Sequence, residues 1–109
     1  MTHMYPQYLK EYDNFDTLET DFGFIIYKIE LDHIFIRDIY ILPEFRNGIK
    51  GKILGDLITQ VAEENGKPSL VGCVWLKSKT PELTMQYLIR WGMKFAFTDK
   101  EMMFFKKDL

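Results

Sequence analysis

The sequence is poor in cysteine and has no excess of positive charge. Its single cysteine, Cys73, rules out a disulfide within the chain, and no histidine or second cysteine lies at a zinc-ligand spacing from it. We therefore expect no metal site, and we expect Cys73, which lies in an apolar stretch, to be a buried small hydrophobic residue. The formal net charge of −2 lacks the basic surplus of nucleic-acid-binding domains, so no nucleic-acid partner is expected.

Long apolar runs are also missing. No run approaches the roughly 20 residues that a membrane-spanning helix needs. The N-terminus lacks the basic segment followed by an apolar stretch that marks a secretion signal. Repeats, low-complexity segments and linkers are absent too, and 109 residues is the length of one domain. We expect a cytoplasmic protein of a single domain, 1–109, without a membrane partner.

What the sequence does contain favours a β-sheet. Apolar residues make up 47% of the chain and aromatic residues 16%, which indicates a packed, sheet-rich core. Residues 22–31 and 33–42 are both rich in β-branched and aromatic side chains, and they predict an antiparallel pair. The second segment is apolar on both faces except at Arg37 and Asp38, which indicates a central strand.

A long amphipathic helix follows this pair. Its apolar residues lie on one helical face: Ile49, Ile53, Leu54, Leu57, Ile58, Val61 and Ala62. Gly66 and Pro68 mark its end. Residues 69–76 then predict another buried strand. Strand, helix and strand together predict a βαβ unit with parallel strands.

The two ends of the chain complete the expected order of elements. Pro81 to Gly92 predicts a second, shorter helix, and residues 94–98 and 102–106 predict a closing hairpin. At the N-terminus we expect a short helix over residues 6–13 and a polar connection over 14–21. The whole pattern predicts an α/β domain with a mixed sheet.

The segment from Ile36 to Ala62 is the strongest functional signal. It reads as a buried strand, a Pro43 corner, a loop with two glycines, and the long helix. The first N–H groups of a helix have no intrahelical partner, and the helix dipole favours negative charge there. This arrangement predicts a phosphate-binding site.

The run DIYILPEFR from Asp38 to Arg46, the helix after it, and the ending from Trp91 to Leu109 resemble the GCN5-related N-acetyltransferases, the GNAT family. The resemblance covers about residues 22–109. It implies a GNAT-like mixed sheet with an antiparallel pair, a βαβ crossover, a second helix and a C-terminal hairpin. Residues 1–21 would form a variable segment in place of the family's usual N-terminal strand and two helices.

In that family, a loop of the pattern Arg/Gln-x-x-Gly-x-Gly/Ala holds the pyrophosphate of acetyl-CoA. Here Arg46 takes the first position and Gly51 the last, while Ile49 replaces the middle glycine. We expect this β-branched residue to restrict positive φ angles and close backbone approach. The resemblance implies that acetyl-CoA binds at Ile41, Leu42, Arg46, Asn47, Gly48, Ile49, Lys50 and Gly51, with the oxyanion contact from a backbone N–H near Ile41 or Leu42.

Two residues are candidates for catalysis. Asp38 falls on the position of the family's general base, and an apolar strand should raise the pKa of its carboxyl toward neutral pH. The alternative is that Asp38 pairs with Arg37, with His33 or with a cap donor and has no chemical role. The family's proton-donating tyrosine aligns with Leu88. Tyr87 is the neighbouring candidate, but it lies about 100° around the helix, so a packing role is its alternative.

Two functions remain open from the sequence. The first is an acyl-CoA-dependent N-acetyltransferase that acts by direct attack of a small-molecule or protein amine on acetyl-CoA. The second is a catalytically degenerate GNAT-like binding or structural protein, favoured by Ile49, Leu88 and the short N-terminal segment. An exposed aromatic sheet face would then need a partner, such as a second copy in a homodimer. Such small chains resemble bacteriophage proteins, which implies an assembly or host-interaction role.

Overall fold

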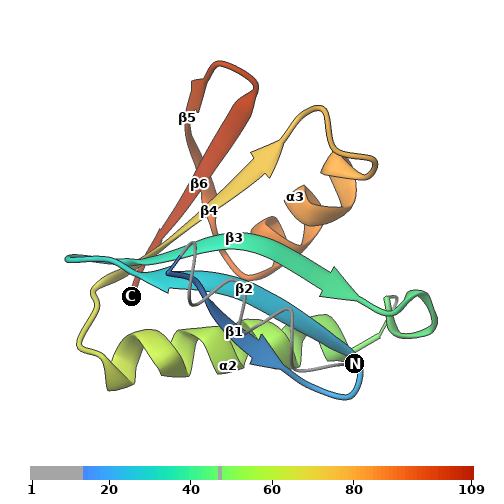
Figure 1. Cartoon of the computed structure of the whole chain (residues 1–109), viewed down its shortest axis with the longest axis horizontal. Coiled ribbons are helices and arrows are strands. Elements are labelled where there is room, and N and C mark those ends of the chain that lie inside the picture. The colour runs from blue at the N-terminus through green and yellow to red at the C-terminus, as the bar shows by residue number, and fades with distance from the viewer. Residues whose placement is uncertain (1–13, 47) are drawn as a thin grey trace.

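The computed structural model describes residues 14–46 and 48–109, which form a mixed sheet with two α-helices. The sheet order is β1-β2-β3-β4-β6-β5 (Figure 1). The elements are β1 (Asp16–Glu19), β2 (Gly23–Ile29), β3 (Ile34–Ile41), a 3₁₀ turn η2 (Pro43–Phe45), α2 (Lys50–Glu64), β4 (Ser69–Trp75), α3 (Pro81–Arg90), β5 (Lys94–Asp99) and β6 (Met102–Asp108). Strands β3 and β4 are parallel, and the other neighbouring strands are antiparallel.

This arrangement confirms the predicted antiparallel pair, the βαβ unit, the second helix and the closing hairpin. The prediction of a connection over residues 14–21 is wrong, because Asp16–Glu19 forms the edge strand β1. Leu18 lies opposite Ile25 and packs against the core, whereas the acidic residues around it conceal the strand pattern. The helix predicted over residues 6–13 lies outside the described residues.

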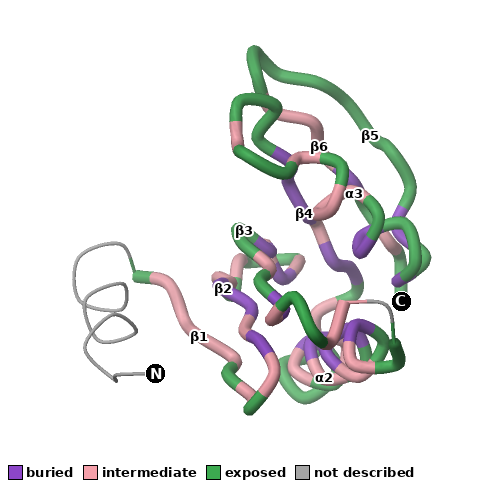
Figure 2. The backbone as a smooth tube through the Cα atoms, turned by 90° about the vertical axis from the view of Figure 1, so that its right-hand side faces the viewer, coloured by how far each residue is buried: buried purple, intermediate pink, exposed green. Residues whose placement is uncertain are grey.

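Both helices pack on the same face of the sheet (Figure 2). The core between them combines sheet residues with one face of each helix: Ile25, Ile34, Ile36 and Ile41 from the sheet, Leu54, Ile58 and Ala62 from α2, and Leu88 and Trp91 from the α3 end. Burying a side chain of this kind stabilises the fold by roughly 1.5–3 kcal/mol. In the described part of the chain, no helix is long and apolar enough to cross a membrane.

The two helices approach each other closely at a glycine. A Cβ atom on Gly55 would lie 2.5 Å from Cδ1 of Trp91, so a side chain there would collide with the indole ring. The Trp91 Nε1–H also donates a hydrogen bond to the Gly51 carbonyl oxygen at 2.8 Å. The C-terminal end of α3 is therefore held against the first half of α2.

Strand β3 contains a β-bulge at the point where it leaves β4. Its parallel pairing with β4 ends at Ile36, opposite Gly72. Its pairing with β2 skips Arg37, because Tyr27 lies opposite Ile36 while Ile26 lies opposite Asp38. Such an extra residue shifts the alternation of side chains by one position. After the bulge, the buried face toward the helices continues with Ile39 and Ile41, and Asp38 faces the other side.

Candidate functional site

A pocket of about 500 Å³ opens where β3 and β4 separate. We call it the strand cleft; its lining residues are Arg37, Asp38, Ile39, Cys73, Trp75, Ser78, Thr80, Thr84 and Met102. The bulge in β3 is what brings Asp38 into its wall, since regular alternation from Ile36 would turn that side chain toward the core. Hydroxyl groups from the β4–α3 connection and from α3 line the same space. The cleft thus combines a carboxylate, several hydroxyls and apolar surface.

Two features act on the pKa of the Asp38 carboxyl in opposite directions. Burial raises the pKa of Asp38 above its ordinary value, and the neighbouring Arg37 guanidinium acts in the opposite, lowering direction. The Arg37 Nε and the Asp38 Oδ2 lie 3.5 Å apart. Of the two alternative partners, His33 pairs with Asp32 instead, at 2.7 Å. The direction of this pKa shift agrees with the prediction from the sequence, and the Asp38 side chain keeps 57% of its surface exposed at the mouth of the cleft.

Cys73 lies beside this carboxyl, and its thiol is unreactive. Its side chain is buried, and its Sγ donates to the Arg37 carbonyl oxygen at 3.8 Å. Burial, assisted by the charge of Asp38, raises the pKa of Cys73 to about 11. The thiol therefore stays protonated near neutral pH. Its contact with the Arg37 carbonyl oxygen holds the backbone at the bulge. This confirms the expectation of a buried, small hydrophobic residue.

The described residues Gly48 and Ile49 of the loop between β3 and α2 have ordinary backbone conformations. Ile49 has φ −72° and ψ −12°, in the right-handed helical region. Gly48 is not among the residues with positive φ, and a Cβ atom on it would meet nothing within 4 Å. Neither position therefore needs a positive φ angle, and the restriction that Ile49 places on close approach to the backbone stays a prediction. Asn47 lies outside the described residues.

One predicted oxyanion donor at the end of β3, the Leu42 N–H, is already engaged within the protein. The Leu42 N–H donates to the Phe22 carbonyl oxygen at 2.8 Å, so it is not a free oxyanion donor. The Ile41 carbonyl oxygen accepts a hydrogen bond from the Arg46 Nε at 2.9 Å. Arg46 also lies over the Tyr40 ring, 5.7 Å from its centre. The loop is thus held to the end of β3 by Arg46.

The N-terminus of α2 is open to an anion. Ile49 is the N-cap residue and makes no side-chain capping bond, and the first turn of the helix carries no acidic residue. The first turn instead contains Lys50 and Lys52, whose charges add to the helix dipole. The Lys50 ammonium lies over the Phe22 ring, 5.0 Å from its centre, and Lys52 pairs with Asp56 at 3.0 Å.

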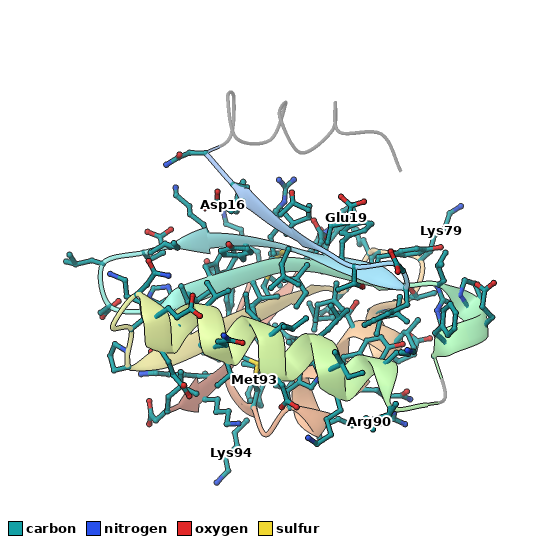
Figure 3. The ribbon with its side chains drawn as sticks, turned by 90° about the horizontal axis from the view of Figure 1, so that it is seen from below. Asp16, Glu19, Lys79, Arg90, Met93 and Lys94 are labelled. Carbon is teal, nitrogen blue, oxygen red and sulfur yellow. The ribbon has the colours of Figure 1, made fainter. Side chains whose placement is uncertain are left out.

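A second pocket, of about 240 Å³, lies beside this helix end. We call it the helix pocket; its lining residues are Gly48, Gly51, Lys52, Tyr87, Arg90 and Trp91. Figure 3 shows Arg90 beside the N-terminal half of α2. A Cβ atom on Gly51 would lie 3.2 Å from the Tyr87 ring, so the small residue there leaves room for that ring. Tyr87 and Asp38 therefore line different pockets.

Several solved structures share this arrangement. The PaiA N-acetyltransferase from Thermoplasma acidophilum, in complex with coenzyme A, matches with a TM-score of 0.73 and 20% identity over 93% of this chain and 66% of that chain. A putative GNAT-family acetyltransferase from Desulfovibrio desulfuricans matches with a TM-score of 0.69 and 14% identity, over 84% of this chain and 64% of that one. The chain has the GNAT fold.

The chain spans about two thirds of the length of each of these two GNAT proteins. The anti-CRISPR protein AcrVA5 matches with a TM-score of 0.65 and 19% identity, over 83% of this chain and 96% of that one. No protein-family model matches the sequence, and no curated protein matches it. The predicted GNAT-like mixed sheet is confirmed, and at these identities the likeness concerns the fold.

The sequence interpretation of this GNAT fold missed Arg90 and the hydroxyls of the strand cleft. Arg90 follows Tyr87 by three residues, so both lie on one helical face, and that spacing was a usable signal. The hydroxyls of Ser78, Thr80 and Thr84 had no such signal, because their approach to Asp38 depends on how β3 and β4 separate. At the position of the family's tyrosine, Leu88 is fully buried against Gly72.

Proposed function

We propose that this chain is an acyl-CoA-dependent N-acetyltransferase that transfers an acetyl group from acetyl-CoA to an amine by direct attack. The observation that carries the proposal is the strand cleft with Asp38 in its wall. The strand that contributes Asp38 leads directly into the uncapped N-terminus of α2. A carboxylate cleft and an anion-binding helix end on consecutive elements suit a donor with a reactive acyl end and a phosphate-bearing end.

The residues at the helix end fit the phosphate part of acetyl-CoA. The first-turn N–H groups of α2 have no side-chain cap, and Arg46, Lys50 and Lys52 bring positive charge to them. Gly51 lets the Tyr87 ring pack directly against the first turn of α2. Among the structural neighbours, the Thermoplasma protein was determined in complex with coenzyme A. Acetyl-CoA would supply the activated thioester, and these residues would hold and orient it.

Asp38 would act as the base of the reaction. An amine attacks a thioester only in its neutral form, so a proton must leave the ammonium first. A carboxyl whose pKa is raised by burial accepts that proton more readily than an ordinary aspartate. Hydroxyls of Ser78, Thr80 and Thr84 in the same cleft can donate hydrogen bonds to charge that develops on oxygen or sulfur.

Calorimetry with acetyl-CoA tests the donor site. The wild-type chain should bind, and Gly51→Trp, whose side chain would displace the Tyr87 ring from the first turn of α2, should abolish binding; circular dichroism checks that the variant is folded. Gly51→Ala gives a milder second variant, expected to weaken binding without loss of the fold. No heat of binding at about millimolar acetyl-CoA would end the enzyme proposal.

Turnover tests the role of Asp38. Thiol release from acetyl-CoA would be followed with a panel of amines, including a lysine peptide and a small polyamine. Asp38→Asn should remove turnover but leave the affinity for acetyl-CoA intact. Asp108→Asn is the matched control, because Asp108 forms an exposed ion pair with Lys106. It should change neither turnover nor the affinity for acetyl-CoA. Unchanged turnover in Asp38→Asn would exclude Asp38 as the base.

A second candidate function is a GNAT-like binding protein without catalysis. It is favoured by exposed aromatic residues on the sheet face opposite the helices, where Trp75 is 52% and Phe97 54% exposed. The near-complete match in length to an anti-CRISPR protein agrees with a host-interaction role. A second copy of the chain would be the simplest partner. Sedimentation should then show a dimer that Phe97→Ser converts to a monomer; a wild-type monomer that turns over acetyl-CoA would exclude this candidate.

A further inference from the structure

A third pocket, of about 330 Å³, lies on the sheet face away from the two helices. We call it the acidic pocket; its lining residues are Glu19, Thr20, Asp21, Gly23, Phe24, Tyr40 and Leu42. Glu19, Phe24 and Tyr40 lie opposite one another on β1, β2 and β3, so their side chains share one face. The neighbouring row, which includes Leu18 and Ile25, packs toward the helices, so the acidic pocket is on the opposite face.

The charge of this pocket comes from the carboxylates of Glu19 and Asp21, both of which are exposed. Neither forms an ion pair within residues 14–46 and 48–109. Other carboxylates of the sheet do pair, as Asp108 does with Lys106. The pocket therefore presents two negative charges that no described basic residue compensates, and a cation is the ligand that complements them.

The side of the pocket formed by β2 and β3 is aromatic. The rings of Phe24 and Tyr40 are stacked, with their centres 5.5 Å apart. Aromatic ring faces attract ammonium and guanidinium groups, and the Arg46 guanidinium lies 5.7 Å from the centre of the Tyr40 ring, although Arg46 does not line the pocket. Among the described residues, no group of three acidic, histidine or cysteine side chains could hold a metal ion. An organic cation fits this pocket better than a metal ion does.

The acidic pocket adjoins the proposed base. Tyr40 follows Asp38 by two residues on β3, and both side chains lie on the face away from the helices. Two residues of a strand span about 7 Å, and Glu19 lies two strands, or about 10 Å, from β3. Figure 3 shows Glu19 on the side of the sheet away from α2. An amine at Asp38 can therefore extend past Tyr40 and bring a second positive charge to the acidic pocket.

We propose that the acidic pocket binds a second cationic group of the acceptor, so that the preferred acceptor is a linear diamine and not a monoamine. Glu19 and Asp21 accept hydrogen bonds from the remote ammonium, and Tyr40 contacts the chain that joins the two nitrogens. The diamine specificity rests on the proposed acetyl transfer. The affinity of the pocket for a diamine does not.

Kinetics with matched amines test the specificity. Linear diamines of increasing length would each be compared with the monoamine of the same length. A diamine that reaches the pocket should have a kcat/KM about ten-fold above that of its monoamine, the effect of one hydrogen bond between charged groups. The double variant Glu19→Gln/Asp21→Asn should remove this preference by raising the KM for the diamine, with kcat and monoamine turnover unchanged. Asp99→Asn, at an exposed carboxylate on the opposite edge strand β5, is the matched control and should keep the preference.

Calorimetry without acetyl-CoA separates the pocket from the enzymatic activity. The wild type should bind the diamine, more weakly at high salt, and both the double variant and Tyr40→Leu should bind it about ten-fold more weakly. Diamine binding that depends on Glu19 and Asp21, without turnover of any amine, would support the pocket and overturn the proposed function. Equal kcat/KM for diamines and monoamines in the wild type would overturn the diamine proposal and leave the acetyltransferase standing. A preference for diamines that survives in the double variant would overturn it as well.

Discussion

Asp38 links the pH dependence of activity to the bulge that places its carboxyl in the wall of the strand cleft. Because burial raises the pKa of its carboxyl, turnover should rise with pH as Asp38 loses its proton, with a midpoint above that of an ordinary aspartate. A pH–rate profile of acetyl transfer measures this midpoint. The same profile for Arg37→Gln should shift to higher pH, since the lowering influence of the guanidinium is lost. A midpoint near that of a free aspartate in both proteins would contradict the assignment.

The same raised pKa has a consequence for stability. The folded state binds a proton at Asp38 more tightly than the unfolded state, so this contribution to stability is fully present below the ordinary carboxyl pKa. It is lost as pH rises through the higher, folded-state pKa. Asp38→Asn should therefore flatten the fall in stability over this range. Urea unfolding from about pH 4 to 7 tests it, and an unchanged slope would contradict it.

Tyr87→Phe should stabilise the free protein. Removal of a buried hydroxyl that has no described partner should raise the free energy of unfolding by about 1 kcal/mol. Urea unfolding without ligand provides the measurement. Tyr27→Phe on β2 serves as the control for a general effect of tyrosine removal. A loss of stability in Tyr87→Phe would show that the hydroxyl has a partner within the free protein.

At the scale of elements, the bulge in β3 decides which side chains enter the core. Insertion of one residue between Arg37 and Asp38 would shift the alternation by one more position and turn Asp38 and Tyr40 toward the helices in place of Ile39 and Ile41. Two lost buried isoleucines and a buried carboxylate should unfold the chain or cost several kcal/mol. Arg37→Ala keeps the native number of residues and should cost about 1 kcal/mol or less. Thermal unfolding of the two variants provides the comparison.

The regular elements could be predicted from the sequence because their signals are local. The apolar face of α2 and the β-branched runs of β2, β3 and β4 are visible in short windows. Three features could not be predicted in this way. The edge strand β1 carries mostly polar residues, the bulge depends on the register against β2, and the contact of Tyr87 with Gly51 depends on how two helices pack.

The same distinction between local sequence signals and tertiary packing applies to the residues of the candidate site. Asp38, Arg46 and Gly51 were identified because the resemblance supplied positions for them within one continuous segment. Arg90 and the cleft hydroxyls come from a different part of the chain and meet that segment only in the folded protein. Tyr87 was recognised as a candidate, but which pocket it lines depends on the packing of α3 against α2.

At the scale of the whole molecule, Trp91 connects three parts of the structure. Its carbonyl oxygen accepts a hydrogen bond from Lys107 of β6 at 2.9 Å, and its indole N–H reaches Gly51 of α2. Gly55→Ala places a methyl group within 2.5 Å of this indole ring. It should cost about 1–3 kcal/mol of stability and displace the wall of the helix pocket. Gly48→Ala, whose Cβ meets nothing, is the control for stability; equal melting temperatures would contradict the prediction.

The open end of α2 also bears on how long the protein persists in a cell. The free chain carries helix amides without a side-chain cap, which the phosphates of the proposed donor would satisfy. A ligand that binds only the folded state adds about 2.7 kcal/mol of stability at one hundred times its dissociation constant. Resistance to proteolysis would then rise and fall with the supply of acetyl-CoA. Abundance of this small chain would in that way follow the metabolic state of its surroundings.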